Sequence, residues 1–535
     1  MNTLATAKSI TPFLGMASLG ALVSCQTQEE KVEAKNPNIV IILADDMGYG
    51  DVSFNNPFAR TRTPNIDQMA INGLCFTDAH AGGAVSIPSR YGLMTGRYFF
   101  REEKRDSYWG YLSPLIDPGR ETIGSLMQKA GYTTACVGKW HLGLEWGRKD
   151  ESLPLITDRK TLGYTNADFC VPVKNSPNDV GFDYSFILPA SLDMPPYAFI
   201  RNGKAIDPDI ILTADAYPNS QEETNYAWDS KHVNENDIYW DRGVWWRNGE
   251  MSKSFKVEDC LDNIVDEGLS FIKRHVTENK DKPFMLYLPL TGPHTPWMPN
   301  ESFKNTSGMG AYGDFISQID DVVYKVNNLL EQLQIDENTI VIFTSDNGSA
   351  WQEEDIQGYG HRSNGQWRGM KGDAWEGGHR TPLFIKWPAK IKKQQKYTQN
   401  ISLIDILATF ADLTNQTVED KYGEDSFSFY HVLNGDMSKP TRDHLIYISS
   451  SGKLAITKDN WKYIDALGSA GFSNPTRINP VPGGPTGQLY HLTEDPTEST
   501  NRFLTDKGKV DELQALMKQV VDQGYSKNKK QKEVR

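Results

Sequence analysis

Cysteine is scarce in this chain, which has 5 cysteines among 535 residues. Cys75, Cys136, Cys170 and Cys260 show no spacing that is typical of a zinc site or of a disulfide framework. Cys75 and Cys136 lie in apolar stretches, and we expect both to be buried thiols. The length is too great for one simple domain but sufficient for a large core with a smaller second unit.

An excess of positive charge is also lacking. The chain carries 56 Lys and Arg against 69 Asp and Glu, which gives a formal net charge of −13 at pH 7. We therefore exclude nucleic acid as a partner, because no basic stripe could neutralise its phosphates. A small anionic substrate is compatible with this composition, since a local cluster of Lys, Arg and His can be positive on an acidic protein.

The apolar run near the N-terminus, residues 12–23, is too short to cross a bilayer. It is typical of a signal peptide, which we place at residues 1–24. Residues 22–25, Leu-Val-Ser-Cys, resemble a bacterial lipobox, in which Cys25 is lipidated and becomes the mature N-terminus. An ordinary signal peptide with cleavage nearby is the alternative. We expect residues 25–36 to form a polar tether, and the protein to be an exported bacterial lipoprotein in the periplasm or at the outer membrane or cell surface.

Apolar runs typical of buried strands alternate with stretches of helical period. The predicted strands are residues 38–44, 132–137, 283–290, 339–344 and 382–387. The predicted helices are residues 121–130, 257–277, 315–333 and 403–413, with a further helix opening at 63–70. This alternation predicts an α/β fold over residues 37–439, with a mostly parallel central sheet flanked by helices.

The pattern changes near residue 440. Short strands at hairpin spacing are predicted at residues 445–448, 454–458, 461–464 and 488–492, followed by a helix over 510–521. We therefore expect residues 440–535 to form a small C-terminal α+β subdomain with an antiparallel sheet and one helix. The basic residues from Lys527 to Lys532 are interpreted as a solvated end of the chain.

Polar clusters follow four of the predicted strands. These clusters are Asp45 and Asp46, Lys139 and His141, His294, and Asp346 and Asn347. Turn chemistry could explain any one of them, but ligands of parallel sheets bind beyond the carboxyl ends of the strands, where all four clusters fall. Their carboxylate and amide oxygens favour Ca²⁺ or Mg²⁺ over Zn²⁺.

A helix N-terminus is predicted at Ser86. Residues 86–97 are Ser-Ile-Pro-Ser-Arg-Tyr-Gly-Leu-Met-Thr-Gly-Arg, with Pro88 where a first helical turn would start and Gly96 where a short helix would stop. Free N–H groups and the helix dipole favour an anion there, and Arg90 lies one turn along. For Ser-x-Pro alone, an ordinary capping serine is the alternative.

The full pattern from Ser86 to Arg97 resembles the signature of type I sulfatases, an arylsulfatase-like family with an alkaline-phosphatase-like fold. Further blocks that match the family in order are residues 43–51, 138–143, 293–296, 344–348, 368–382 and 490–496. The resemblance implies that Ser86 is oxidised to formylglycine (3-oxoalanine) by a radical-type sulfatase-maturating enzyme, as in serine-type bacterial members. One hydroxyl of the hydrated aldehyde would then attack sulfur.

The resemblance also implies roles for the polar clusters. It implies one Ca²⁺, with Mg²⁺ possible, held by Asp45, Asp46, Asp346, Asn347 and the formylglycine at position 86. Arg90 would hold the diol, and Lys139 and Lys371 would bind the sulfate oxygens. His294, near the leaving oxygen of the bound substrate, would act as general acid. His141 would take a proton from the second diol hydroxyl, which expels sulfate and restores the aldehyde.

The chain departs from the family pattern at two positions of the block at residues 368–382. The family usually has an apolar residue where His379 and Thr381 stand. We interpret both as local variation, and His379 receives no catalytic role.

Residues 146–251 match no family block but are rich in aromatic side chains. They include Tyr197, Tyr217, Tyr226, Trp228, Tyr239, Trp240, Trp245 and Trp246. Aromatic faces on loops suit stacking against sugars, although packing explains many such residues. With the predicted lipid anchor they suggest a sulfated glycan as substrate, such as a galactose or N-acetylgalactosamine sulfate, by analogy with the fold.

Two alternative functions are compatible with parts of this sequence. The first is a phosphomonoesterase or phosphonate hydrolase of the same superfamily, in which unmodified Ser86 attacks phosphorus; the 10 histidines show no grouping for two zinc ions. The second is a non-catalytic lipoprotein that binds sulfated glycan. His141 and His294 argue against it, because binding alone needs the cations and not the proton carriers.

Overall fold

The computed structural model describes residues 36–103, 109–156, 163–217, 226–227, 243 and 245–527. The predicted signal peptide, Cys25 with nearly all of the tether, the side chains of Tyr226, Trp228, Tyr239 and Trp240, and the basic end beyond residue 527 lie outside this description. The described residues belong to one compact unit, Asn36–Arg535. Within them, no helix combines the length and the apolar character that crossing a membrane requires.

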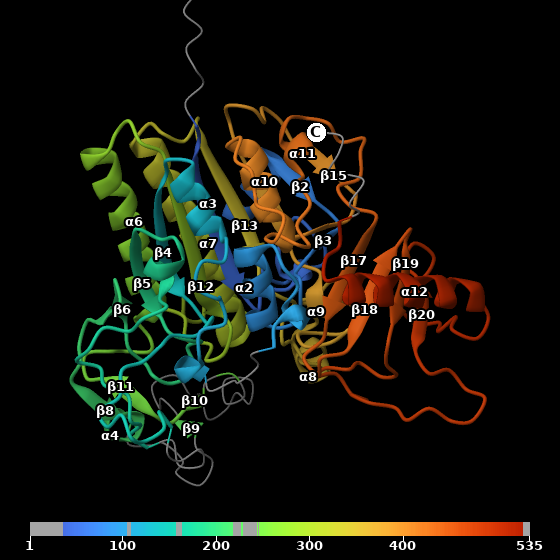
Figure 1. Ribbon diagram of the computed structural model, residues 1–535, viewed down its shortest axis with the longest axis horizontal. Coiled ribbons are helices and arrows are strands. Elements are labelled where there is room, and N and C mark those ends of the chain that lie inside the picture. Colours follow the sequence, from blue (N-terminus) through green and yellow to red (C-terminus); the bar gives the residue numbers. More distant parts are fainter. Residues whose placement is uncertain are drawn as a thin grey trace, which may run out of the picture. The chain divides into compact units, whose positions relative to one another are not determined.

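A ten-stranded sheet forms the centre, in the order β15-β2-β14-β13-β1-β12-β4-β5-β6-β7 (Figure 1). Its strands are β1 (Asn38–Asp45), β2 (Leu74–Phe76), β4 (Thr133–Lys139), β5 (Tyr184–Leu188), β6 (Ile200–Arg201), β7 (Lys204–Ala205), β12 (Phe284–Pro293), β13 (Thr339–Ser345), β14 (Leu383–Lys386) and β15 (Gln395–Tyr397). The five central strands, from β13 to β5, are parallel. The prediction of an α/β fold with a mostly parallel sheet is therefore confirmed.

The strand predicted at 382–387 differs from the others in direction. It is β14, which pairs antiparallel with both β13 and β2. The chain between β13 and β14 holds α8 (Glu353–Tyr359) and α9 (Glu376–His379). These short helices do not form the long crossover that returns a chain to a parallel neighbour.

β1 shows why the central strands read as continuous apolar runs. Residues after Asn38 are all buried, because helices cover both faces of the sheet. Ile39, Ile41 and Leu43 point to one face, and Val40 and Ile42 to the other, so alternate residues enter two separate hydrophobic clusters. The register pairs Ile41 with residues of β12 and β13 on its two sides.

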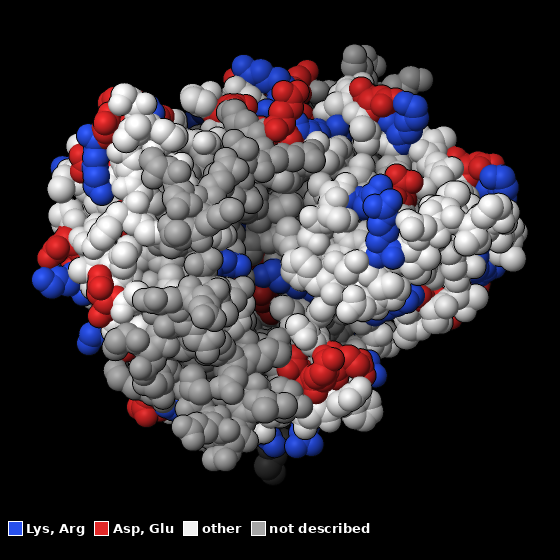
Figure 2. Space-filling model, turned by 90° about the horizontal axis from the view of Figure 1, so that it is seen from below, with Lys and Arg blue, Asp and Glu red and all other residues white. Residues whose placement is uncertain are grey.

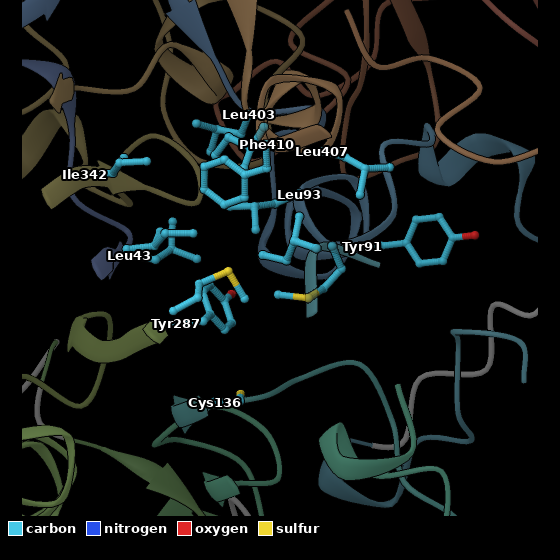
Figure 3. Packing of buried hydrophobic residues seen from close by; sticks show 14 of the residues in the cluster. Leu43, Tyr91, Leu93, Cys136, Tyr287, Ile342, Leu403, Leu407 and Phe410 are labelled. Carbon is cyan, nitrogen blue, oxygen red and sulfur yellow. The ribbon is translucent and has the colours of Figure 1, made fainter. Parts of the chain in front are cut away.

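The helices that cover these two faces come from different parts of the chain (Figure 1). One face packs against α1 (Pro64–Ile71), α6 (Cys260–Glu278) and α7 (Gly310–Gln332). The other packs against α2 (Ser86–Thr95), α3 (Ile123–Lys129) and α10 (Ile406–Leu413). Figure 3 shows the second cluster, where Leu43, Tyr287 and Ile342 of the sheet converge with Leu93 and Phe410 of the helices.

The other strands and α-helices that the structure describes before residue 440 are short. They are β3 (Ala79–His80), β8 (Ile210–Leu212), β9 (Tyr226–Ala227), β10 (Trp246–Arg247), β11 (Glu250–Ser252), β16 (Ile401–Ser402), α4 (Thr213–Ala216) and α11 (Tyr430–Leu433). α7 begins at Gly310, five residues before the predicted start. The prediction missed these residues because the glycines at 308–313 interrupt the helical period to which the buried Ala311 and Tyr312 belong.

The C-terminal part is a four-stranded antiparallel sheet in the order β17-β18-β19-β20, which confirms the prediction. Its elements are β17 (His444–Ile448), β18 (Leu454–Lys458), β19 (Trp461–Ile464), β20 (Gln488–His491) and α12 (Lys507–Gln523). They share a third hydrophobic cluster, to which Tyr98 and Ile404 of the main sheet's covering segments contribute. The domain boundary at 439/440 stays a prediction.

Candidate active site

The carboxyl ends of four neighbouring strands bring the predicted polar residues together. β1 ends at Asp45, β4 ends at Lys139, and Asp346 directly follows β13. His294 directly follows β12, which lies between β1 and β4. Figure 2 looks onto this end of the sheet, and shows Lys and Arg side chains beside acidic ones within a hollow.

Ser86 is the first residue of α2, as predicted from the helix signals around it. The helix ends at Gly96, whose φ of 65° is left-handed and whose N–H donates to the carbonyl of Gly92. The Ser86 hydroxyl donates to Oδ2 of Asp346 at 2.6 Å and lies 3.2 Å from Oδ1 of Asp45. The helix therefore presents this hydroxyl to the carboxylates at the ends of β1 and β13.

Three cations surround the same point. Lys139 Nζ lies 2.6 Å from Oδ2 of Asp45 and 3.2 Å from the Ser86 hydroxyl. Arg90, one turn along α2, donates from Nε and Nη2 to Oδ2 of Asp346 at 3.0 and 2.9 Å. Lys371 Nζ lies 2.8 Å from Oδ2 of the neighbouring Asp46. The structure thus gathers the positive charge that a bound sulfate requires.

The two predicted histidines differ in their surroundings. Burial, followed by the charges of Lys139 and Arg90, lowers the pKa of His141 well below its ordinary value. His141 is therefore a neutral imidazole near pH 7 and can accept a proton. His294 donates from Nδ1 to the carbonyl of Thr295 at 2.6 Å, since a carbonyl can only accept. Its Nε2 lies 3.7 Å from Asp46 Oδ2.

The carboxylates and the amide form a set of oxygens that suits a divalent cation. Ligand atoms of Asp45, Asp46 and His294 all lie within 4.8 Å of one another. Asn347 donates from Nδ2 to Asp46, and its Oδ1 is buried with no hydrogen-bond partner among the described residues. Such an unpaired buried acceptor beside carboxylates fits a hard oxygen-ligated ion such as Ca²⁺.

A second buried group of potential ligands does not fit a metal. His80, Glu376 and His379 lie close together, but the amine of Lys462 lies 3.0 Å from both Glu376 and His379. The ring of His379 also stacks on Tyr447, with the ring centres 3.8 Å apart. None of these five residues lines the cavity described next. The departure of His379 from the family pattern thus belongs to a buried polar network.

A cavity of about 800 Å³ opens above the site. It is lined by Asp46, Ser86, His141, His294 and Lys371 among the predicted residues. The other predicted residues, Asp45, Arg90, Lys139, Asp346 and Asn347, lie beneath this lining and are buried. The cavity is large enough to hold a sugar residue above the polar cluster.

Several lining residues had no signal in the sequence. They are Trp109, Asp193, Arg247, Phe472 and the turn at residues 449–452. Phe472 is 48% exposed and comes from the C-terminal part, where its backbone N–H donates to Asp373 at 2.7 Å. These residues lie on loops or, like Arg247 in β10, in elements too short to show a periodic pattern, so only the folded chain brings them to the cavity.

The aromatic residues predicted for sugar stacking divide into two kinds. Trp245 lines the cavity. Tyr197 and Trp246 are 0% exposed and belong to the core, and Tyr217 packs edge-on against Trp246. Packing, the alternative reading for many of these aromatic residues, therefore accounts for Tyr197 and Trp246.

Known proteins resemble this chain over most of its length. A family model described as Sulfatase matches residues 37–416. An N-acetylgalactosamine-6-O-sulfatase of Bacteroides thetaiotaomicron is 33% identical over 523 residues, which cover 94% of this chain and 98% of that protein. An arylsulfatase of Hemicentrotus pulcherrimus is 29% identical over 479 residues, which cover 84% of this chain and 75% of the relative.

Solved structures agree with these relatives. A structure described under the metabolism of multiple glycosaminoglycans by Bacteroides thetaiotaomicron has a TM-score of 0.75 and 33% identity. It covers 91% of this chain and 99% of that chain, so the central sheet and the C-terminal sheet are both shared. The chain has the predicted alkaline-phosphatase-like fold and belongs to the sulfatase family, whose members hydrolyse sulfuric esters.

Proposed function

We propose that this sulfatase removes a 6-O-sulfate from N-acetylgalactosamine or galactose in a sulfated glycan. The observation that carries this proposal is the 33% identity to an N-acetylgalactosamine-6-O-sulfatase, because it spans 94% of this chain and 98% of that protein. A cavity of about 800 Å³ with aromatic and polar walls supports a sugar as the group that carries the sulfate.

The family implies a formylglycine and a divalent cation, and we assign both to this site. Ser86 is the residue that would be oxidised to formylglycine by a radical-type maturating enzyme. Asp45, Asp46, Asp346 and Asn347 would hold Ca²⁺ together with position 86, which is supported by the unpaired Oδ1 of Asn347. When bound, these groups supply an activated hydroxyl beside a polarised sulfate oxygen.

The residues of the chain bind the sulfate and move the protons. Lys139 and Lys371 neutralise the sulfate oxygens, and their amines are held in advance at 2.6 Å from Asp45 and 2.8 Å from Asp46. Arg90 is fixed by two hydrogen bonds to Asp346 and orients position 86. These contacts cost no reorganisation during the reaction.

The two histidines serve different steps. The sugar alkoxide is a poor leaving group, and His294 at the cavity wall donates a proton to it from Nε2. His141 takes a proton from the hydroxyl group at position 86, which its lowered pKa allows because the ring is neutral. For the same reason, the limb of activity loss at acid pH should lie below pH 6.5, the ordinary pKa of histidine.

Export and anchoring belong to the same proposal. We propose that Cys25 carries the lipid and places the enzyme in the periplasm or at the outer membrane or cell surface. The support is the Leu-Val-Ser-Cys sequence that ends the apolar run at residues 12–23. A membrane-anchored sulfatase acts where a large glycan can reach it.

The test combines mass spectrometry with an assay of released sulfate. Protein made with its maturating enzyme should carry at position 86 an aldehyde about two mass units lighter than serine, and should release sulfate from N-acetylgalactosamine-6-sulfate. Ser86→Ala is the matched control and should release none. Active protein with only serine at position 86 would overturn the assignment of formylglycine, and active protein that releases sulfate from aryl esters alone would overturn the glycan substrate.

A further inference from the structure

Asp193 lines the cavity, and one of its carboxylate oxygens has no hydrogen-bond partner among the described residues. The residue is 2% exposed, and its Oδ1 is buried without a hydrogen bond among the described residues. This oxygen lies 3.7 Å from Nδ1 of His294, but that nitrogen donates its proton to Thr295. A buried acceptor without a partner is costly, so the position is suited to a donor that enters with the substrate.

Arg247 and two tryptophans hold Asp193 in place. Nη1 of Arg247 contacts Oδ2 of Asp193 and lies 3.3 Å from its carbonyl oxygen. The backbone N–H of Arg247 donates to the same carbonyl at 3.1 Å. The guanidinium lies 5.4 Å from the ring centres of both Trp109 and Trp245. One carboxylate oxygen is thus anchored, which fixes the direction of the other before substrate binds.

The chemistry of Asp193 restricts what its free oxygen can bind. A carboxylate repels the sulfate group, which the cations Lys139 and Lys371 attract. Lys371 binds Asp46, which lies 3.7 Å from Nε2 of His294, whereas Asp193 lies 3.7 Å from Nδ1 of the same ring. With His294 placed at the ester oxygen, as the proposed function requires, the nearest neutral donors of the substrate would be the hydroxyl groups of the sugar ring. Trp109 and Trp245 line the same part of the cavity and offer apolar surface to the carbon skeleton.

We propose that Oδ1 of Asp193 accepts a hydrogen bond from a hydroxyl group of the sulfated sugar and so determines which sugars the enzyme accepts. This inference rests on the proposed function, because it requires a sugar ring in the cavity. Asp193 would thereby be a specificity-determining residue, supported in its position by Arg247. A sugar without that hydroxyl leaves the carboxylate unpaired and binds poorly in the transition state.

The test pairs a change in the protein with a change in the substrate. The mature Ca²⁺-loaded enzyme and its Asp193→Asn variant are assayed on methyl N-acetylgalactosaminide 6-sulfate and on its 3-deoxy and 4-deoxy derivatives. In Asp193→Asn the amide oxygen turns to Arg247, so the cavity presents a donor where it had an acceptor. For one deoxy substrate, wild-type kcat/KM should fall by about 10- to 100-fold, as for a hydrogen bond to a charged group.

If the hydrogen bond exists, the loss in kcat/KM caused by the variant and the loss caused by the deoxy substrate should not multiply. Asp193→Asn should lower kcat/KM on the parent sugar by about 10- to 100-fold and show little further loss on that same deoxy substrate. A residue that merely positions His294 would instead lose the same factor on every substrate. Asp209→Asn is the matched control, since Asp209 is a 65% exposed carboxylate that does not line the cavity, and it should leave all ratios as in wild type.

The outcomes separate the inference from the proposed function. If wild-type enzyme releases no sulfate from any of these sugars, the proposed function is wrong. If wild-type enzyme is active but the losses multiply for both deoxy substrates, the inference is wrong and the proposed function stands. Should Asp193→Asn fail to fold because Arg247 loses its ionic partner, Asp193→Asn combined with Arg247→Gln removes both charges and must show the same absence of further loss.

Discussion

Lys139→Met tests whether the carboxylate of Asp45 depends on two kinds of cation, the lysine and the proposed Ca²⁺. Lys139 Nζ lies 2.6 Å from Oδ2 of Asp45, and both side chains are 0% exposed. Nη2 of Arg90 lies 3.4 Å from the other oxygen of Asp45. Methionine keeps the length of the side chain and removes its charge, so Asp45 is left with Arg90 as its nearest cation.

The expected loss of stability follows from these distances. At an effective dielectric constant of about 20, two unit charges 2.6 Å apart attract each other by about 6 kcal/mol. Loss of one partner from a buried pair costs about 3–5 kcal/mol, and we expect the free energy of unfolding in chelator to fall by this amount. In excess Ca²⁺ the loss should be smaller, because an ion at Asp45 replaces part of the missing charge and stabilises the folded state by mass action.

The assay is unfolding in urea, measured for wild type and variant in chelator and in Ca²⁺. Burial acts to raise the pKa of Asp45, but Lys139, His294 and Arg90 outweigh it and hold the pKa below its ordinary value of 3.8. Ionised Asp45 therefore adds stability above this ordinary value, and that stability is lost as the pH falls through the lower folded pKa. The difference between wild type and Lys139→Met should be complete near neutral pH and shrink below about pH 4.

Lys462→Met is the matched control. Lys462 is equally buried and lies 3.0 Å from carboxylates of both Glu376 and Glu498, away from the cavity. The free energy of unfolding that Lys462→Met loses should be the same with and without Ca²⁺. If Lys139→Met shows the same loss in chelator and in Ca²⁺, Asp45 is not a ligand of the ion. A loss in chelator under about 1 kcal/mol, which is the size of a surface pair, would refute the account of the buried pair.

The remaining predictions concern activity and anchoring. Ser86→Ala should abolish turnover while the melting temperature stays close to that of wild type, and strong destabilisation would contradict a purely chemical role. Chelation should remove activity, and Ca²⁺ should restore it. Activity in protein that elemental analysis shows to be free of metal would disprove this prediction. His294→Ala should lose about 10²- to 10⁴-fold of its activity on glycan sulfates, but much less on an aryl sulfate whose phenolate leaves unaided. His141→Ala should lose as much activity on both substrates. Equal losses of activity for His294→Ala on the two substrates would contradict the assignment. Cys25→Ala should move the native protein from the membrane fraction to the soluble fraction, and unchanged partitioning would exclude this anchor.

The sequence by itself determined the class of fold and the inner half of the candidate site. The run from Ile39 to Ala44 could be assigned to a buried strand because a sheet covered on both faces buries successive residues, and the run is too short for a buried helix. Strands that alternate with helices favour a parallel sheet, and the carboxyl ends of parallel strands lie at one edge, so Asp45, Lys139 and Asp346 could be expected there. These residues lie at the ends of apolar runs, and such runs can be recognised in the sequence.

The order and direction of the strands were decided by tertiary structure. Nothing in the apolar run at 382–387 distinguishes β14 from the parallel strands, because the same residues suit both directions. The direction depends on the path of the chain between β13 and β14, which carries Lys371 to Asp46 without crossing the sheet as a long helix. That path is set by packing between segments far apart in the chain.

The residues of the outer cavity wall could be identified only in the folded chain. Asp193, Arg247, Trp109 and Phe472 lie on loops or in elements too short to show a period, such as β10 with Arg247. Contacts with residues far away in the chain hold them at the cavity, such as the hydrogen bond from Phe472 to Asp373. The chemistry of sulfate binding could thus be read from motifs at strand ends, where geometry is repeated in every α/β sheet. The shape that selects the sugar could not, because loop positions are fixed by long-range packing and not by the residues that neighbour them in sequence.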